Sequence, residues 1–210
     1  MKLRYSALLF MLPLAGCKTA GTIDDGGIYT VRSSCPQVAI PAGTGDITLF
    51  NPGDSREAGA VDVTAAITNV RATCTETAGE FISTAVFQVV ATRRDAGAAR
   101  QVVLPYFDIA MQAGNQVVAK KLAGVAINFP AGSNRAITAG QGTVRISRAA
   151  ATLPESVRKV LTARRRVGDT NAAIDPLTDP TIRDAVARAT FQHLVGFQLS
   201  QDQLRYNATR

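Results

Sequence analysis

The sequence predicts a mainly β fold: an antiparallel, immunoglobulin-like β-sandwich with a small helical insertion at about 153–189 and a short C-terminal helix. Apolar and polar residues alternate in short runs between residues 36 and 148, and clusters of Gly, Asn, Asp and Pro separate these runs. No helical pattern interrupts the six or seven runs, which favours antiparallel pairing. The chain has no Trp, so we predict the architecture of an immunoglobulin-like sandwich and not membership of that family.

The strands are expected from the phase of the alternation. Val61, Val63, Ala65 and Ile67 share one face of the clearest run. Pro105 interrupts a later run and predicts an edge strand or a bulge there. The segment 113–115, Ala-Gly-Asn, predicts the tight turn of a hairpin. The predicted strands are 37–40, 47–50, 61–68, 81–91, 101–111, 116–129 and 142–147, with a final strand at 191–199.

Helix signals begin after residue 150. Thr152 is expected as the N-cap, with Pro154 in the first turn and Glu155 in the capping-box position. This helix is expected to end among Arg164, Arg165 and Arg166. Asp179-Pro180 predicts the start of a second helix, and Ser200 with Gln203 predicts the capping box of a terminal one.

The N-terminus has the pattern of a secretory signal. Lys2 and Arg4 precede an apolar run that is too short to cross a bilayer, which needs roughly 20 residues. The run ends in Leu14-Ala15-Gly16-Cys17, which resembles the lipobox of bacterial lipoproteins. The resemblance implies that residues 1–16 are removed, that Cys17 receives a diacylglycerol, and that its new amine is acylated, for example with palmitate. The alternative is an ordinary signal peptide followed by an unrelated Cys.

The lipoprotein resemblance also predicts location and domain organisation. Lys18 stands where an Asp signals retention in the inner membrane, so we expect a lipid anchor in the outer membrane and a domain in the periplasm. Residues 17–34 are rich in Gly, Thr and Ser and predict a flexible tether. Residues 35–210 are expected to form a single domain.

The remaining two cysteines, Cys35 and Cys74, form an even pair in an oxidising compartment, which predicts a disulfide. A loop of this length contributes about 4 kcal/mol in the chain-entropy model. Two Cys and one distant His do not make a zinc site.

The positive charge predicts an anionic surface as a partner more readily than nucleic acid, which an envelope protein rarely meets. The formal charge is +7 and falls to +5 when the signal peptide takes Lys2 and Arg4 with it. The run Arg164-Arg165-Arg166 is a candidate contact for lipid phosphates or an acidic partner. The alternatives are a solvated helix end and positive charge scattered over the surface for solubility.

The C-terminal segment 194–207, Leu-Val-Gly-Phe-Gln-Leu-Ser-Gln-Asp-Gln-Leu-Arg-Tyr-Asn, is similar to the C-terminus of a group of alphaproteobacterial envelope lipoproteins. In that group a sandwich core precedes such a tail. The resemblance implies no activity, and it places the helical insertion as the region where this chain differs from the group.

The sequence shows no constellation typical of an enzyme, so we predict no catalysis, no cofactor and no metal site. His193 lies among apolar residues and is expected to be packed or hydrogen-bonded and not catalytic. Asp108 is expected as a surface carboxylate at a bulge. The pair Asp24-Asp25 is expected to be solvated charge and not a metal site. The segments 43–45 and 140–142 are Gly-rich and are expected to be turns without the context of a phosphate-binding loop.

Two functions remain open from the sequence. The first is a membrane-anchored, non-catalytic module that binds another envelope protein through strand edges or the insertion at 150–190. The second is a carrier or sensor that binds a small or lipid-like ligand between the sheet and the inserted helices.

Overall fold

The computed structural model describes residues 22–24, 27–29, 35–163 and 174–209. Backbone contacts divide the chain into two units, Met1–Arg32 with Arg164–Ala172 and Ser33–Ala163 with Ala173–Arg210. In the first unit, β1 (Thr22–Asp24) and β2 (Gly27–Tyr29) form an antiparallel pair. The expected signal peptide, Cys17, Asp25 and Arg164–Arg166 lie outside the described residues.

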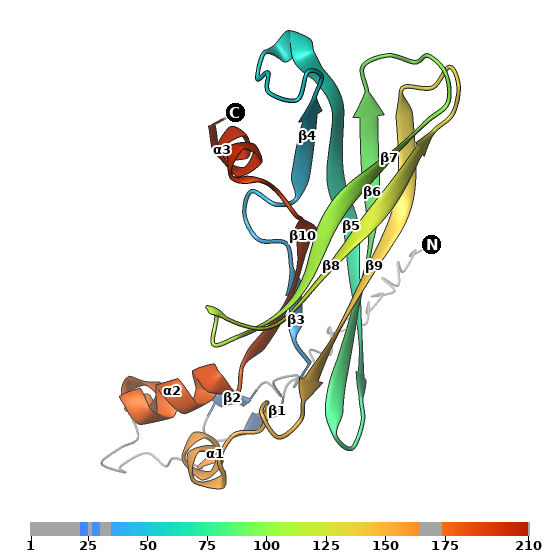
Figure 1. Ribbon diagram of the computed structural model, residues 1–210. Coiled ribbons are helices and arrows are strands. Elements are labelled where there is room, and N and C mark those ends of the chain that lie inside the picture. Colours follow the sequence, from blue (N-terminus) through green and yellow to red (C-terminus); the bar gives the residue numbers. More distant parts are fainter. Residues whose placement is uncertain (1–21, 25–26, 30–34, 164–173, 210) are drawn as a thin grey trace, which may run out of the picture. The chain divides into compact units, whose positions relative to one another are not determined.

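The second unit contains two four-stranded sheets, which confirms the prediction of a mainly β, largely antiparallel fold (Figure 1). One sheet has the order β3-β10-β7-β8, and only its β3–β10 pair is parallel. The other has the order β4-β5-β6-β9 and is antiparallel throughout. The strands of the first sheet are β3 (Gln37–Ala39), β10 (Phe191–Phe197), β7 (Arg100–Gln112) and β8 (Gln116–Phe129). Those of the second are β4 (Asp46–Phe50), β5 (Val61–Glu76), β6 (Glu80–Arg93) and β9 (Arg135–Ser147).

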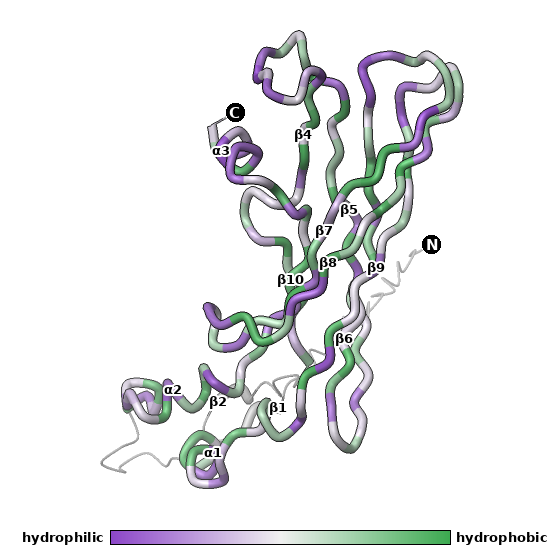
Figure 2. Tube along the Cα trace, in the orientation of Figure 1, coloured by the Kyte–Doolittle hydropathy of each residue, from purple (hydrophilic) through white to green (hydrophobic). Residues whose placement is uncertain are grey.

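The two sheets share one apolar core, because every second residue of their strands points between them. Val63 of β5, Phe87 of β6, Leu104 of β7 and Ile127 of β8 are all fully buried in this cluster. Burial of each such side chain contributes about 1.5–3 kcal/mol. Hydrophobic and hydrophilic residues alternate along the strands, as the sequence predicted (Figure 2).

The expectation that residues 140–142 form a turn is wrong, because they lie in the middle of β9. The two glycines are needed because other side chains pack closely against their backbone. A Cβ on Gly140 would collide with the ring of Phe87, and one on Gly142 would lie 2.7 Å from the carboxylate carbon of Asp108. Glycine inside a strand often marks such a close approach.

The expectation that Pro105 marks an edge strand or a bulge is also wrong. Strand β7 is central, and its register shift lies between Ala110 and Met111. The carbonyl of Pro105 accepts a hydrogen bond from the N–H of Gln198, just beyond the last residue of β10. The missing N–H of Pro105 therefore points to the side where β10 has ended, and the pairing with β8 does not need it.

The predicted hairpin turn at residues 113–115 is confirmed. Ala113 and Gly114 have φ values of 55° and 78°, and the N–H of Asn115 donates to the carbonyl of Gln112. Two successive positive φ values are the signature of a type I′ turn, which fits the twist of antiparallel strands.

Two of the three α-helices begin at the caps that the sequence predicted. Helix α2 (Pro180–Arg188) begins after Asp179, whose carboxylate accepts from the N–H of Thr181, and α3 (Gln201–Thr209) begins with the Ser200–Gln203 capping box. Helix α1 (Glu155–Thr162) has Pro154 at its N-cap, so the expected cap at Thr152 is wrong. The Thr152 hydroxyl donates to the carbonyl of Arg148 instead.

The structure also contains two short 3₁₀ helices, η1 (Ala58–Ala60) and η2 (Pro176–Thr178). None of the helices among the described residues has the length and apolar character needed to span a bilayer.

The predicted disulfide between Cys35 and Cys74 is present. Cys35 lies two residues before β3 of one sheet, and Cys74 lies in β5 of the other. The bond therefore ties the two sheets together at one end of the core, beside Phe81 and Ile146.

Two arginines hold loops and strands at the other end. The guanidinium of Arg93 is almost fully buried and donates to the carbonyls of Gly97, Ala98, Pro130 and Ser133. Arg100 of β7 makes a two-pronged ion pair with Asp62 of β5, at 2.6 and 2.7 Å. The hydrogen bonds from Arg100 lower the pKa of Asp62 below its usual range.

The turn gives a matched stability test. Ala113→Asn should raise the free energy of unfolding by roughly 0.5–1 kcal/mol, because Asn tolerates positive φ better than Ala. Gly114→Ala should lower it by about 1–2 kcal/mol, although a Cβ there meets no atom within 4 Å. Urea denaturation followed by circular dichroism measures both changes. A loss in Ala113→Asn would contradict the turn geometry.

Candidate functional site

A buried network of three side chains lies between the two sheets. Oγ of Ser83 is 2.9 Å from Nδ1 of His193, and Nε2 of His193 is 2.5 Å from Oδ1 of Asp108. The other carboxylate oxygen of Asp108 accepts a hydrogen bond of 2.6 Å from the backbone N–H of Thr143. Ser83 and His193 are 0% exposed and Asp108 is 2% exposed. The network therefore has hydrogen-bond partners for its buried polar groups.

The network connects four strands of two sheets. Ser83 lies in β6 and Thr143 in β9, whereas Asp108 lies in β7 and His193 in β10. Asp108 faces the core because it shares the phase of Leu104 and Tyr106 along β7, and its carboxylate fits against Gly142. The expectation of a surface carboxylate at position 108 is therefore wrong.

Tyr106 adds a second contact from β7 to β9. Its hydroxyl donates to the carbonyl of Gln141 at 2.7 Å. Burial, together with the nearby Asp108 carboxylate, raises the pKa of Tyr106 above its usual value. The phenol therefore keeps its proton through the neutral range and remains a donor.

The network has the residue types of a hydrolytic triad but not its arrangement. In the Ser–His–Asp template the hydroxyl contacts Nε2 and the carboxylate contacts Nδ1, and the hydroxyl must reach a substrate. Here the two ring nitrogens are exchanged, and Ser83 is closed off from solvent. What the geometry does provide is a polar connection between the sheets. The prediction that His193 is packed or hydrogen-bonded is confirmed.

Sequence reasoning missed Ser83 and misplaced Asp108. Both carried a signal: each polar residue occupies the core phase of an otherwise apolar run, Ser83 between Phe81 and Ala85 and Asp108 between Tyr106 and Ala110. A polar residue in a core phase requires a partner. Which partner it meets depends on pairing between distant strands.

The sheets have four outer edges, and β9 forms one of them. An edge strand presents backbone N–H and C=O groups that can pair with another chain. On β9, the carbonyl of Gln141 accepts a hydrogen bond from the hydroxyl of Tyr106, and the N–H of Thr143 donates to the carboxylate of Asp108. Side chains of the facing sheet therefore close part of this edge.

Helix α3 packs on β4, the opposite edge of the same sheet. The amide of Asn207 donates to the carbonyls of Gly43 and Asp46. The ring of Tyr206 packs edge-to-face on Phe50 at 5.1 Å. The C-terminal segment therefore covers a strand edge.

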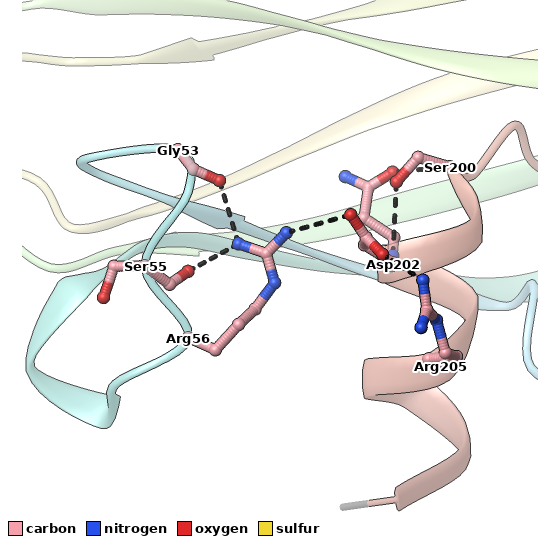
Figure 3. A network of polar contacts seen from close by, with 7 residues as sticks. Gly53, Ser55, Arg56, Ser200, Asp202 and Arg205 are labelled. Carbon is pink, nitrogen blue, oxygen red and sulfur yellow. Dashed lines mark hydrogen bonds and ion pairs between the residues drawn. The ribbon is translucent and has the colours of Figure 1, made fainter.

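Charged residues join α3 to the loop that follows β4 (Figure 3). Arg56 lies 5.1 Å from the centre of the Phe50 ring and 4.0 Å from Asp202, which also pairs with Arg205. Arg56 further donates to the carbonyls of Gly53 and Ser55. Helix α3 buries no residue fully and is mostly hydrophilic (Figure 2), so polar and aromatic contacts hold it in place.

The other sheet ends in β3 and β8. Strand β3 is only three residues long. In β8, by contrast, every residue from Gln116 to Leu122 is exposed, and no described strand pairs with its outer edge. Strands β8 and β9 lie side by side near their connecting loop and diverge toward Gln116 (Figure 1). This free segment, 116–122, is called the β8 edge below.

The β8 edge combines apolar and cationic side chains. Leu122 is 59% exposed, Val117 is 51% exposed and Val118 is 45% exposed. Lys120 and Lys121 follow one another and therefore point to opposite faces of the sheet. The register places Lys120 opposite Ile109 and Lys121 opposite Asp108. Among described residues, neither lysine has an ion-pair partner, and Asp108 is engaged by His193 and Thr143.

The described fold and site define a mainly β protein whose two sheets are joined by a buried polar network and whose longest open edge is β8. No protein-family model, curated protein or solved structure matches the chain. Its function is therefore inferred from its sequence and its structure.

The network predicts unequal effects of two Asp substitutions. Asp108→Ala should lower the free energy of unfolding by about 3–5 kcal/mol, because it leaves His193 and the Thr143 N–H buried without their partner. Asp202→Ala removes the ion pairs with Arg56 and Arg205. Because its carboxylate is 60% exposed, this should cost at most about 1 kcal/mol. Chemical denaturation of both variants tests this. Similar small losses would show that the Asp108 contacts do not hold the sheets together.

Proposed function

We propose that this chain is a lipid-anchored envelope protein that acts as a non-catalytic protein-interaction module, and that the β8 edge is its contact surface. The observation that carries the proposal is the exposure of 116–122 on both faces at an open sheet edge. Exposed backbone groups together with exposed Val and Leu side chains are what a protein partner recognises by strand addition.

The non-catalytic part of the proposal is supported by the burial of the one Ser–His–Asp cluster among the described residues. A nucleophile has to contact its substrate, and Ser83 is 0% exposed. A mainly structural role for the cluster is consistent with its position between the sheets.

The anchor and the location rest on the resemblance of Leu14-Ala15-Gly16-Cys17 to a lipobox and on Lys18, which favour the outer membrane and a periplasmic domain. We also propose that the paired sheets are a variant of the immunoglobulin-like sandwich. The large apolar cluster shared by the two four-stranded sheets supports this.

The anchor predicts the behaviour of a Cys17 variant. Cys17→Ala should leave an unprocessed precursor or release a periplasmic form, because the thiol that accepts the lipid is missing. Fractionation of cells and the mass of the purified protein measure this. A cleaved product that stays in the membrane would contradict the anchor.

The contact surface predicts where a partner can be captured. A photo-crosslinking amino acid at Leu122 should give one dominant adduct with another protein in cells. The same amino acid at Ile137 is the matched control, because Ile137 is 57% exposed and lies on β9 of the other sheet. It should give no such adduct. Mass spectrometry identifies the captured protein.

Three outcomes would count against the interaction proposal. Equal adducts at both positions would indicate non-specific contact. Adducts with lipid at Leu122 would indicate a membrane-facing strand. No adduct at Leu122, with a working crosslinker on a known complex, would remove the β8 edge as the contact.

A further inference from the structure

We infer that the β8 edge receives an extended, acidic segment of its partner as an added strand, with carboxylates beside Lys120 and Lys121. The inference rests on the proposed function and specifies the chemistry of the partner. Its first support is elimination among the sheet edges of the described residues. Side chains of β7 close part of β9, α3 packs on β4, and β3 has three residues, so the β8 edge is the long open one.

The second support is charge. Lys120 and Lys121 lie on opposite faces, and neither forms an ion pair with a described residue. An added strand would bring its side chains about 4.5–5.5 Å from those of β8, a distance at which opposite charges attract and like charges repel. Carboxylates on both faces of the incoming strand would therefore be stabilised.

The same lysines argue against a second copy of this chain as the occupant. Antiparallel pairing of two β8 edges would bring four ammonium groups together within one short ladder. Lysines on an edge strand oppose pairing with a second copy of the same cationic edge. They leave the edge open to a strand of opposite charge.

The register adds a requirement for apolar side chains. Lys120 and Leu122 share the outer face, opposite Ile109 and Phe107 of β7. Val103, on the same face of β7, is 60% exposed. A partner residue that lies beside Leu122 would extend this apolar surface. We therefore expect the incoming segment to combine acidic residues with Val, Ile or Leu.

The first experiment measures binding of synthetic nine-residue peptides to the purified full chain by fluorescence anisotropy. A Val/Glu peptide that repeats Val-Val-Glu-Glu carries Glu on both of its faces, and it should bind at least about tenfold more tightly than a Val/Lys peptide that repeats Val-Val-Lys-Lys. Methylation of every backbone nitrogen of the Val/Glu peptide should abolish binding, because it removes the N–H donors from both edges of the peptide and strand addition needs those of one edge. Equal binding of the methylated peptide would overturn strand addition.

The second experiment reverses the charge. Lys120→Glu with Lys121→Glu should lose affinity for the Val/Glu peptide and prefer the Val/Lys peptide. The matched control, Lys159→Glu with Arg183→Glu, changes the net charge equally at exposed positions of α1 and α2 and should bind as the parent does. Equal weakening by both pairs would overturn a specific role for the two lysines. A parent chain that sediments as a dimer through β8 would favour a second copy and also overturn the inference.

The two proposals can fail separately. A protein adduct at Leu122 in cells without any peptide preference would overturn the acidic-strand inference and keep the interaction module. Peptide binding without a cellular adduct would keep the acidic-strand inference and overturn the interaction module.

Discussion

The position of Asp108 is the constraint on which the two-sheet arrangement depends. Its carboxylate lies between the sheets, meets His193 of β10 and the backbone of Thr143 in β9, and through His193 reaches Ser83 of β6. Apolar contacts can slide, but these hydrogen bonds are satisfied at one register only. A slip of β7 by one residue would turn the carboxylate to the outer face and an apolar side chain toward His193. The network therefore specifies how the sheets pack.

The same constraint decides which edges remain open. Because Asp108 and Tyr106 reach across to β9, side chains from the core supply partners that a neighbouring strand would otherwise provide. Glycine at position 142 makes these contacts possible, because any side chain there would displace the Asp108 carboxylate. Strand β8 lies on the other side of β7 and receives no such cover beyond its shared end with β9. The contacts that close part of β9 therefore have no counterpart on the β8 edge.

Local chemistry in the sequence predicted the alternating strands, the Ala113–Gly114 turn, the caps at Asp179 and Ser200, and the disulfide. What it could not predict depends on distant partners. Gly140 and Gly142 look like turn residues until Phe87 and Asp108 are placed against them. Pro105 suggests an edge until β10 is known to end beside it. Ser83 and Asp108 lie 25 residues apart on different sheets, so only the three-dimensional pairing joins them to His193.

The C-terminal segment and the proposed contact surface lie at different edges of the domain. The segment 194–207 ends in Tyr206 and Asn207. Tyr206 packs on Phe50 of β4, and Asn207 hydrogen-bonds to Asp46 at the start of this strand. This segment therefore helps to close an edge of the domain. The proposed contact surface lies elsewhere, on the β8 edge, where two lysines and exposed apolar residues select for charge as well as for shape. A protein with a tail of the same kind but another charge pattern on this edge would share the closure and bind a different partner.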